Sequence, residues 1–197
     1  MHLNPHKCIF CVESGRLLGF IVSRDKIRID PFKVEAILAL PPPNTITQLQ
    51  SLQGKANFLH RFVCNYVEMS QGYMRLLKKN TPFIWDEQAQ LSFEKLKHAL
   101  TNAPFIHPQD YSKDFALYLA ASNATIAMVS VQESHDGEEH VVYYLSKSLL
   151  GPEIRYCHVE NLASVAVFVV QRFHHYILLR KTTIVVDANL MYHILTR

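Results

Sequence analysis

The sequence predicts a mixed α+β or α/β chain in two parts, a hairpin with helices followed by a domain built on a mixed sheet. Three observations support this fold class. Helical periods predominate from about residue 31 to 103, after the short strand-like runs of the hairpin, and a second set of strand-like runs begins after about 104. The later segments follow the order β-β-β-α-β-α, a meander and then a crossover to a strand that would pair in parallel. Charge divides similarly, because residues 1–80 carry 11 Lys and Arg against 5 Asp and Glu, whereas residues 81–197 carry 9 against 12.

A β-hairpin is predicted at the start of the chain. Residues 7–13 and 17–23 are rich in β-branched and aromatic side chains, which favour strands. Ser14-Gly15 lies between the two runs and is the predicted turn. Lys26–Ile29 alternates polar and apolar residues, and this alternation predicts a further short strand.

Helices are predicted after the hairpin from their start signals. Asp30-Pro31 combines a capping carboxylate with a proline at the first helical position. Thr45 and Gln48 have the spacing of a reciprocal capping box, and Asp86 is a third N-cap candidate. We expect helices over about 31–40, 46–63, 67–79 and 86–100.

A mixed sheet is predicted for the second part. Strands are expected at 115–119, 126–132, 141–145 and 182–186, with a helix over 159–176 between the last two. That helix is apolar nearly all round, so we expect it to be well buried. Residues 190–195 predict a final helix, in or just after which the sequence stops, so the domain is expected to be truncated at its C-terminus.

Composition excludes several classes of protein. Half of the chain, 49%, is hydrophobic, which is enough for a core, and no run approaches the ~20 residues of a membrane span. No signal-like segment opens the sequence, and four cysteines do not form a disulfide framework. We therefore expect an intracellular protein of the cytoplasm or nucleus that is not secreted. Cys8, Cys11, Cys64 and Cys157 are interpreted as core thiols, with metal binding as a minor alternative.

Several separated stretches resemble a known family. They are LLGFIVSRDKIRIDPFKVEAI, LQSLQGKANFLHRFV, FIWDEQAQLSFEKLKHALTNAP, FALYLAASNATIAMVSVQE and VVYYLSKSLLGPEIRYCHVENLA. In order and spacing they resemble the end of the reverse transcriptase and the ribonuclease H of Gypsy-type long-terminal-repeat retrotransposons, and they look most like plant members. The resemblance covers essentially the whole chain, which would then be a fragment of a Pol polyprotein.

The resemblance implies a division of the chain. Residues 1–30 are similar to the end of the palm, with a hairpin like the primer grip, and residues 31–80 are similar to the thumb. Residues 81–110 resemble a connecting helix, and residues 111–197 resemble a ribonuclease H-like domain. The YxDD turn of the family's polymerase site is missing from this sequence. The chain alone is therefore not expected to perform polymerase chemistry, which requires paired carboxylates and two metal ions.

One helix is the candidate nucleic-acid surface. Gln50, Gly54 and Phe58 recur every four residues and share one helix face. The resemblance implies that such a face lies in the minor groove of the template-primer duplex, with Lys55 and Arg61 contacting phosphates. The alternative from spacing alone is that Gly54 permits close helix packing and Phe58 belongs to the core.

The ribonuclease H site is expected to be inactive. The resemblance places the first metal-binding aspartate of the family at Ala120 and the glutamate at Leu162, where both side chains would instead add to the core. Asp187 matches the third ligand and is the one carboxylate that remains among these positions. One carboxylate does not hold the pair of Mg²⁺ ions that active members of the family use, so no metal or other cofactor is expected here.

The functional hypothesis follows from the candidate nucleic-acid surface and from the ribonuclease H site that is expected to be inactive. The chain is predicted to bind an RNA/DNA or DNA duplex without catalysis, or to support the missing polymerase core of a polyprotein. The alternative is a structural or protein-interaction remnant without affinity for nucleic acid. No membrane partner is expected.

Overall fold

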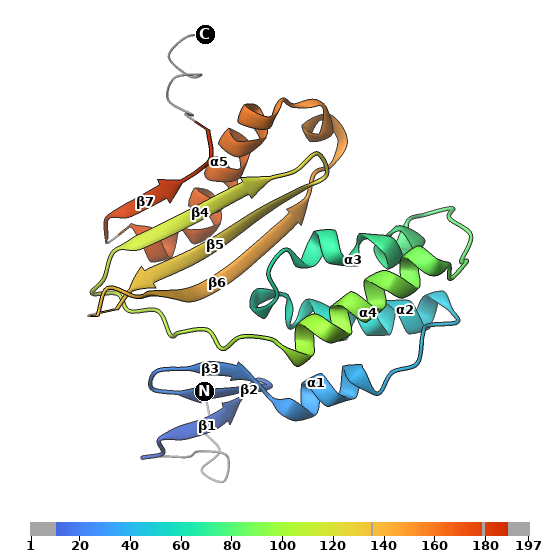
Figure 1. Cartoon of the computed structure of the whole chain (residues 1–197), viewed down its shortest axis with the longest axis horizontal. Coiled ribbons are helices and arrows are strands. Elements are labelled where there is room, and N and C mark those ends of the chain that lie inside the picture. Colours follow the sequence, from blue (N-terminus) through green and yellow to red (C-terminus); the bar gives the residue numbers. More distant parts are fainter. Residues whose placement is uncertain (1–10, 135, 179, 189–197) are drawn as a thin grey trace, which may run out of the picture.

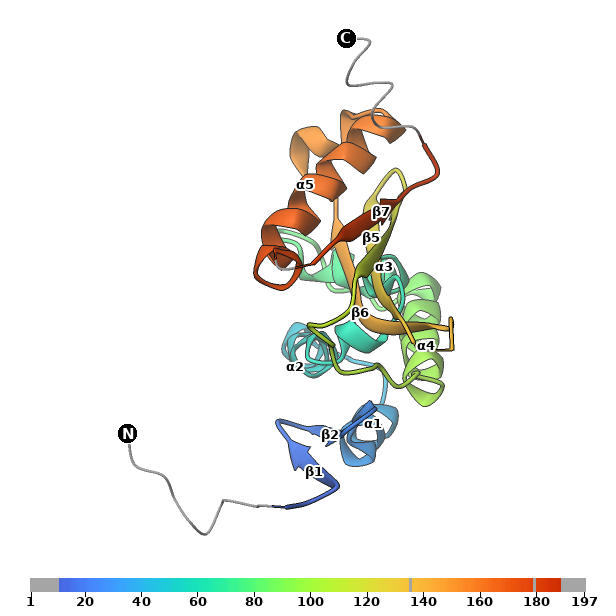
Figure 2. The ribbon, with the colours of Figure 1, turned by 90° about the vertical axis from the view of Figure 1, so that its left-hand side faces the viewer.

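The computed structural model describes residues 11–134, 136–178 and 180–188. Within those ranges, none of the helices combines the length and the apolar composition that a membrane span requires. The predicted helix at 190–195 and the strand residues before 11 lie outside the described residues. Figures 1 and 2 show the hairpin and the first helix at one end of the molecule, the other helices of the first part in the middle, and a sheet covered by a long helix at the other end.

The elements follow the predicted order. The first part holds β1 (Ser14–Leu17), β2 (Phe20–Ser23), β3 (Ile27–Ile29), α1 (Pro31–Leu38), α2 (Ile46–Asn57), α3 (Tyr66–Met74) and α4 (Glu87–Thr101). The second holds β4 (Phe115–Ala121), β5 (Thr125–Glu133), β6 (Glu139–Ser148), α5 (His158–Ile177) and β7 (Thr182–Val185). Short 3-10 helices lie at His60–Phe62 (η2), Arg75–Leu77 (η3) and Gly151–Arg155 (η4).

The hairpin turn lies four residues later than predicted. Ser14 and Gly15 are within β1, where they pair with Ser23 and Val22, and the turn is Leu18-Gly19. Both turn residues have positive φ, 50° at Leu18 and 82° at Gly19. A glycine adopts this backbone readily, whereas a leucine does so only when tertiary contacts hold it. The prediction of a turn at Ser14-Gly15 is therefore wrong, although the hairpin itself is present.

Local capping starts the helices as expected. The Asp30 carboxylate accepts the Phe32 N–H at 3.1 Å, and the Asp86 carboxylate accepts the Ala89 N–H at 2.9 Å. The Arg75 guanidinium also donates a hydrogen bond to Asp86. The hydrogen bond from Arg75 and, to a smaller extent, the one from the Ala89 N–H lower the pKa of the Asp86 carboxyl. At α2 the box is only half formed, since the Gln48 side chain accepts from Asn44 rather than from the cap.

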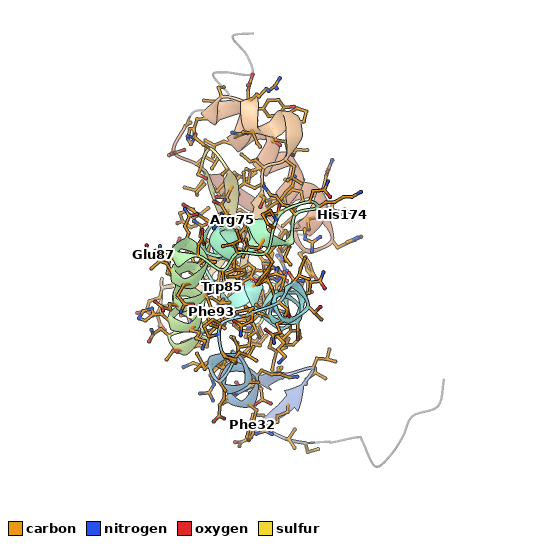
Figure 3. The ribbon with its side chains drawn as sticks, turned by 90° about the vertical axis from the view of Figure 1, so that its right-hand side faces the viewer. Phe32, Arg75, Trp85, Glu87, Phe93 and His174 are labelled. Carbon is orange, nitrogen blue, oxygen red and sulfur yellow. The ribbon has the colours of Figure 1, made fainter. Side chains whose placement is uncertain are left out.

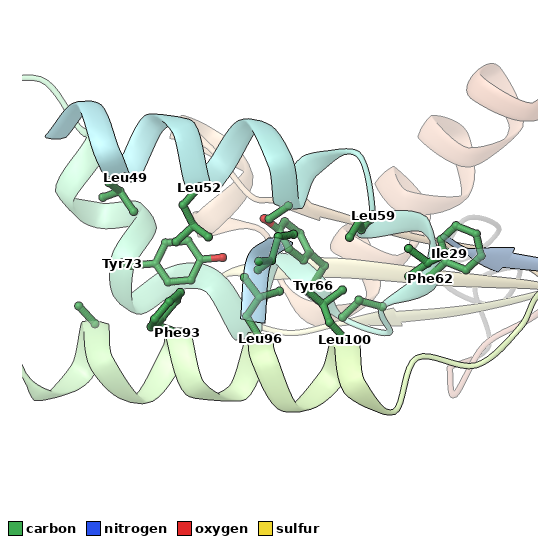
Figure 4. Close-up of a cluster of buried hydrophobic side chains, with 14 of the residues drawn as sticks. Ile29, Leu49, Leu52, Leu59, Phe62, Tyr66, Tyr73, Phe93, Leu96 and Leu100 are labelled. Atoms are coloured by element: carbon green, nitrogen blue, oxygen red, sulfur yellow. The ribbon is translucent and has the colours of Figure 1, made fainter. Parts of the chain in front are cut away.

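One core joins the hairpin to the four helices. Leu49, Leu52 and Ala56 of α2 are buried against α3 and α4, and the side chains meet as Figure 4 shows. Tyr73 lies between α2 and α4, and burial raises its pKa far above that of a free tyrosine. Figure 3 places Trp85 and Phe93 in this middle part and Phe32 at the hairpin end. Helix α2 ends at Asn57 instead of about residue 63, and η2 keeps Phe62 in the same core.

The second part is a four-stranded mixed sheet with the order β6-β5-β4-β7. Strands β4, β5 and β6 form the predicted antiparallel meander, and β7 pairs with β4 in parallel. One face of the sheet packs on Val165, Val169 and Phe173 of α5. Helix α5 is not buried all round, because Val167 and Val170 on its outer side are exposed.

Backbone hydrogen bonds tie the two parts together. Ile27 of β3 and Ile106 of the connecting segment exchange both of their backbone hydrogen bonds, at 2.7 and 3.0 Å. The next residue, His107, donates its N–H to the Val141 carbonyl of β6 at 2.8 Å. A further bond runs from the Val67 N–H of α3 to the Ser146 hydroxyl of β6. The connecting segment is therefore held on both sides.

Candidate nucleic-acid interface

The outer face of α2 carries the residues predicted to meet nucleic acid. Gln50, Gly54 and Lys55 are exposed, and the buried stripe of the same helix points into the core. The Thr45 hydroxyl caps the helix by accepting the Gln48 N–H at 3.2 Å. The helix is thus held by its core face and its cap, and its outer face remains available to a ligand.

Gly54 is open to solvent. A Cβ atom at this position would meet no neighbouring atom within 4 Å. The alternative that this glycine permits close helix packing is therefore wrong. Gly72 in α3 is the glycine that does so, because its Cβ would overlap the Gln88 carbonyl oxygen and the Ser92 hydroxyl of α4. A glycine in the middle of an exposed helix costs ~1 kcal/mol relative to alanine, and no contact of Gly54 within the described part of the chain explains that cost.

Phe58 connects the α2 face to the hairpin. Its ring stacks on Phe20 with centroids 4.5 Å apart and an interplanar angle of 13°. The turn residue Gly19 lies under the same ring, where a Cβ would come within 3.1 Å of it. The side chain is still 38% exposed. Phe58 therefore shares in packing, as the alternative interpretation held, and also presents part of its ring to solvent.

A basic groove lies between α1 and α2. It has a volume of about 390 Å³, and Lys33, Gly54, Lys55 and Phe58 are among its lining residues. Its lining contains no aspartate or glutamate. Sequence reasoning missed Lys33, because its place opposite Lys55 follows from the packing of α1 and not from any spacing along the chain.

Arg61 is oriented differently from the other predicted contacts. Its guanidinium carbon lies 5.5, 5.6 and 5.3 Å from the ring centroids of Phe20, Phe62 and Tyr143. Its Nε atom is buried and has no hydrogen-bond partner among the residues that the structure describes. The residue therefore lies at the junction of the two parts, and not on the exposed face of α2.

The positions matched to ribonuclease H ligands do not come together as a metal site. Leu162 is 0% exposed in α5, as expected for an added core residue. Ala120 is exposed, so the expectation that it adds to the core is wrong. Alternation along β4 explains this, since Leu117 and Leu119 face α5 and Ala120 points to the other side of the sheet.

Asp187 has one polar neighbour that the sequence did not predict. It follows β7 and lies beside the first residue of α5, with His158 Nε2 at 3.2 Å from Asp187 Oδ1. The carboxylate is 70% exposed. The spacing of the two residues in the sequence does not predict this pair. It depends on the parallel pairing of β7 with β4, which brings the end of β7 toward the start of α5.

These residues do not fit a pair of magnesium ions. Mg²⁺ prefers oxygen ligands, and the three matched positions supply one carboxylate, one methyl group and one isobutyl group. Among the residues that the structure describes, no group of three or more His, Cys, Asp or Glu has metal-binding geometry. Cys11, Cys64 and Cys157 are exposed, so their interpretation as core thiols is wrong, and Cys8 lies outside the described residues.

Comparison with known families gives one match over about half of the chain. The model described as "RNase H-like domain found in reverse transcriptase" matches residues 85–184. The Retrovirus-related Pol polyprotein from transposon 297 of Drosophila melanogaster is 29% identical over 188 residues, which cover 95% of this chain and 17% of that protein. The Gag-Pol polyprotein of baboon endogenous virus (strain M7) is 32% identical over 146 residues, 74% of this chain and 8% of that protein. The chain therefore spans less than a fifth of these relatives.

Solved structures share the fold. The foamy viral protease-reverse transcriptase in complex with dsDNA superposes with a TM-score of 0.81 and 19% identity over 94% of this chain and 39% of that one. The same kind of protein in complex with an RNA/DNA hybrid gives a TM-score of 0.80 and 19% identity over 92% and 25%. At this identity the likeness establishes the arrangement of the elements, which confirms the predicted fold class.

Proposed function

The chain belongs to the family of ribonuclease H-like domains found in reverse transcriptases, and we propose on this premise that it binds a nucleic-acid duplex without cutting it. Its relatives are Pol polyproteins of retrotransposons and retroviruses. We assign residues 1–30 to the end of the palm, 31–80 to the thumb, 81–110 to the connection and 111–197 to the ribonuclease H-like domain. The polymerase core of the same polyprotein is the proposed protein partner.

The open face of α2 is the observation that carries the duplex proposal. Gly54 leaves the helix backbone bare, between the exposed Gln50 one turn before it and the exposed part of the Phe58 ring one turn after it. A bare backbone lets a duplex groove come close, while the glutamine amide offers hydrogen bonds to groove edges. Lys33 and Lys55 in the adjacent groove supply charge for phosphates. The structural neighbours bound to dsDNA and to an RNA/DNA hybrid add support for this class of ligand.

Filling the open glycine position is expected to weaken duplex binding while the protein stays folded. Gly54→Leu adds a large side chain at an exposed position where a Cβ atom has no neighbour within 4 Å, so we expect it to fit the folded protein and to collide with a duplex held against this face. We expect the Kd for an RNA/DNA hybrid, measured by fluorescence anisotropy, to rise at least about tenfold, the loss of ~1.4 kcal/mol. Thermal unfolding of the same variant is expected to show no loss of stability, because leucine is the better helix former.

The contribution of positive charge on the α2 face to duplex binding can be tested against a matched control. Lys55→Ala is expected to lower the slope of log Kd against log salt by about 1 for duplex DNA. Lys95→Ala removes an exposed lysine from α4 and is expected to leave the slope unchanged. If Gly54→Leu and Lys55→Ala both bind as the unchanged protein does, the α2 assignment fails. The remaining hypothesis is then a structural or protein-interaction role.

Incubation with an RNA/DNA hybrid in Mg²⁺ or Mn²⁺ is expected to give no cleavage. The reason is the donor set, since Ala120 and Leu162 offer no oxygen ligand beside Asp187. The measurement is gel analysis of a labelled hybrid at several protein concentrations, with Asp187→Asn as the matched control. Cleavage by the unchanged chain that disappears in Asp187→Asn would contradict the proposal, whereas cleavage equal in both would indicate a contaminant.

A further inference from the structure

Two histidine rings stack where the connecting segment meets the sheet. His107 follows Ile106 in the connecting segment, and His140 belongs to β6. Their ring centroids are 4.1 Å apart, and the planes of the rings are inclined by 23°. The His107 N–H donates to the carbonyl of Val141, the neighbour of His140 in β6, at 2.8 Å. The stacked pair is therefore attached to one of the backbone hydrogen bonds that join the two parts of the chain.

The turn between β2 and β3 also reaches the pair. Asp25 of this turn lines a groove of about 210 Å³ together with His107 and His140. Lys26, the next residue, has its Nζ atom 4.2 Å from the ring centroid of Phe105, and that ring meets the His107 ring at a centroid distance of 5.3 Å. The hairpin, the connecting segment and the sheet thus come together around two imidazoles.

Charged groups of both signs surround the two rings. Burial, the nearby His140 and the Lys26 ammonium, in decreasing order, lower the pKa of His107, and together they outweigh Asp25, which acts in the opposite direction. The folded chain therefore resists protonation of His107. The other ionisable residues that share a groove or cavity with His107 are Arg24, Arg61, Asp110, Lys113, Glu133, Tyr143 and Tyr176.

We propose that the His107–His140 pair is a pH-sensitive switch, which holds the hairpin and the helices against the sheet near neutral pH and releases them in acid. Histidine is the side chain whose charge changes in this pH range. Two imidazolium rings at the stacking distance repel each other, and partial burial limits the hydration that would screen them. Separation of the rings relieves this repulsion, but it also pulls His107 away from Val141. The switch is a property of the chain itself and does not rest on duplex binding.

Amide hydrogen exchange at the junction tests the switch. From about pH 7.5 to about pH 5.5, the protection factors of the Ile27, Ile106 and His107 amides are expected to fall at least about tenfold relative to those of amides in the middle of α4. Protection factors are corrected for the intrinsic dependence of exchange on pH. The direction follows from linkage, because the folded pKa of His107 lies below its unfolded value of ~6.5. The stabilisation is complete above that pH and is lost as the pH falls below it.

His107→Phe is the variant that separates titration from packing. It keeps an aromatic ring that can stack on His140, but this ring does not take up a proton. We expect protection at the junction to be retained near neutral pH and its fall in acid to disappear. His140→Phe is expected to make the fall smaller, since burial and Lys26 still act on His107. His98→Gln removes an exposed imidazole from α4 and is expected to leave the fall unchanged.

The pattern of loss decides between the outcomes. A fall confined to the junction and abolished by His107→Phe would support the switch. A fall of equal size in the unchanged chain and in His107→Phe would overturn it, because another group would then sense the proton. Constant protection at the junction would also overturn it, as would an equal loss in α4, which indicates global unfolding. If His107→Phe does not fold, an undiminished fall in His140→Phe is the result that overturns the proposal.

Discussion

Gly72→Ala is expected to destabilise the protein by about 3 kcal/mol, at the upper end of the usual cost of overpacking. Alanine is the better helix former by ~1 kcal/mol, so propensity alone would stabilise α3. The clash decides the outcome, because the added methyl group overlaps the Gln88 carbonyl oxygen, a backbone atom of α4 that cannot rotate away. Separation of α3 from α4 would also loosen Tyr73 and Phe93 in the shared core. The measurement is the midpoint of urea unfolding.

Gly54→Ala is the matched control for this prediction. It makes the same change in a helix interior, but the new methyl group meets no neighbouring atom. We expect it to stabilise the protein by up to ~1 kcal/mol. Unfolding midpoints that move in the same direction for the two variants would show that the close contact at Gly72 is not what the structure indicates.

A carboxylate introduced at Leu162 is expected to cost more than about 3 kcal/mol at pH 7, since a packed leucine is removed and an acid is buried. Leu162 is 0% exposed in α5. Burial favours the neutral acid, so the folded pKa of the new glutamate is raised above its unfolded value of ~4.3. The stability of Leu162→Glu is therefore highest below about pH 4 and falls as the pH rises through the folded pKa.

Leu162→Gln separates the titration from the loss of packing. Its side chain has nearly the same shape but does not ionise, so the Tm difference between the two variants is expected to be small at pH 4 and to grow toward pH 8. Equal Tm values at all pH values would refute the buried-acid argument. A marked rise in the Tm of Leu162→Glu on addition of Mg²⁺ would instead show that Asp187 and the new glutamate can share a metal, against the proposed absence of a metal site.

The sequence predicts helix caps correctly, because a cap depends only on residues that are close together in the chain. Asp30 and Asp86 were predicted as caps from the adjacent residues, and each accepts the expected N–H. The hairpin turn was misplaced because Leu18 is an unfavourable residue for positive φ. What holds the turn there is the pairing of β2 with β3 and the packing of Gly19 under Phe58, and neither can be read from nearby sequence.

Periodicity also has limits when both faces of an element are apolar. β4 reads Phe-Ala-Leu-Tyr-Leu-Ala-Ala, so its pattern does not tell which side meets α5, and Ala120 was assigned to the wrong side. Along α2 the apolar spacing continues past Asn57, because η2 keeps Phe62 buried although the α-helix has ended. The surroundings of Arg61 depend on rings from β2, η2 and β6, which meet only in the folded chain.

The paired amides of Ile27 and Ile106 have a mechanical consequence. Together with the hydrogen bond from His107 to β6, they fix the connecting segment around Ile106, which would otherwise be a flexible linker between the hairpin, the helices and the sheet. Relative rotation of these parts requires breaking backbone bonds, so their mutual orientation is set before any partner arrives. A long, stiff partner that touches both ends of the molecule would then lose little of its binding free energy to ordering the protein.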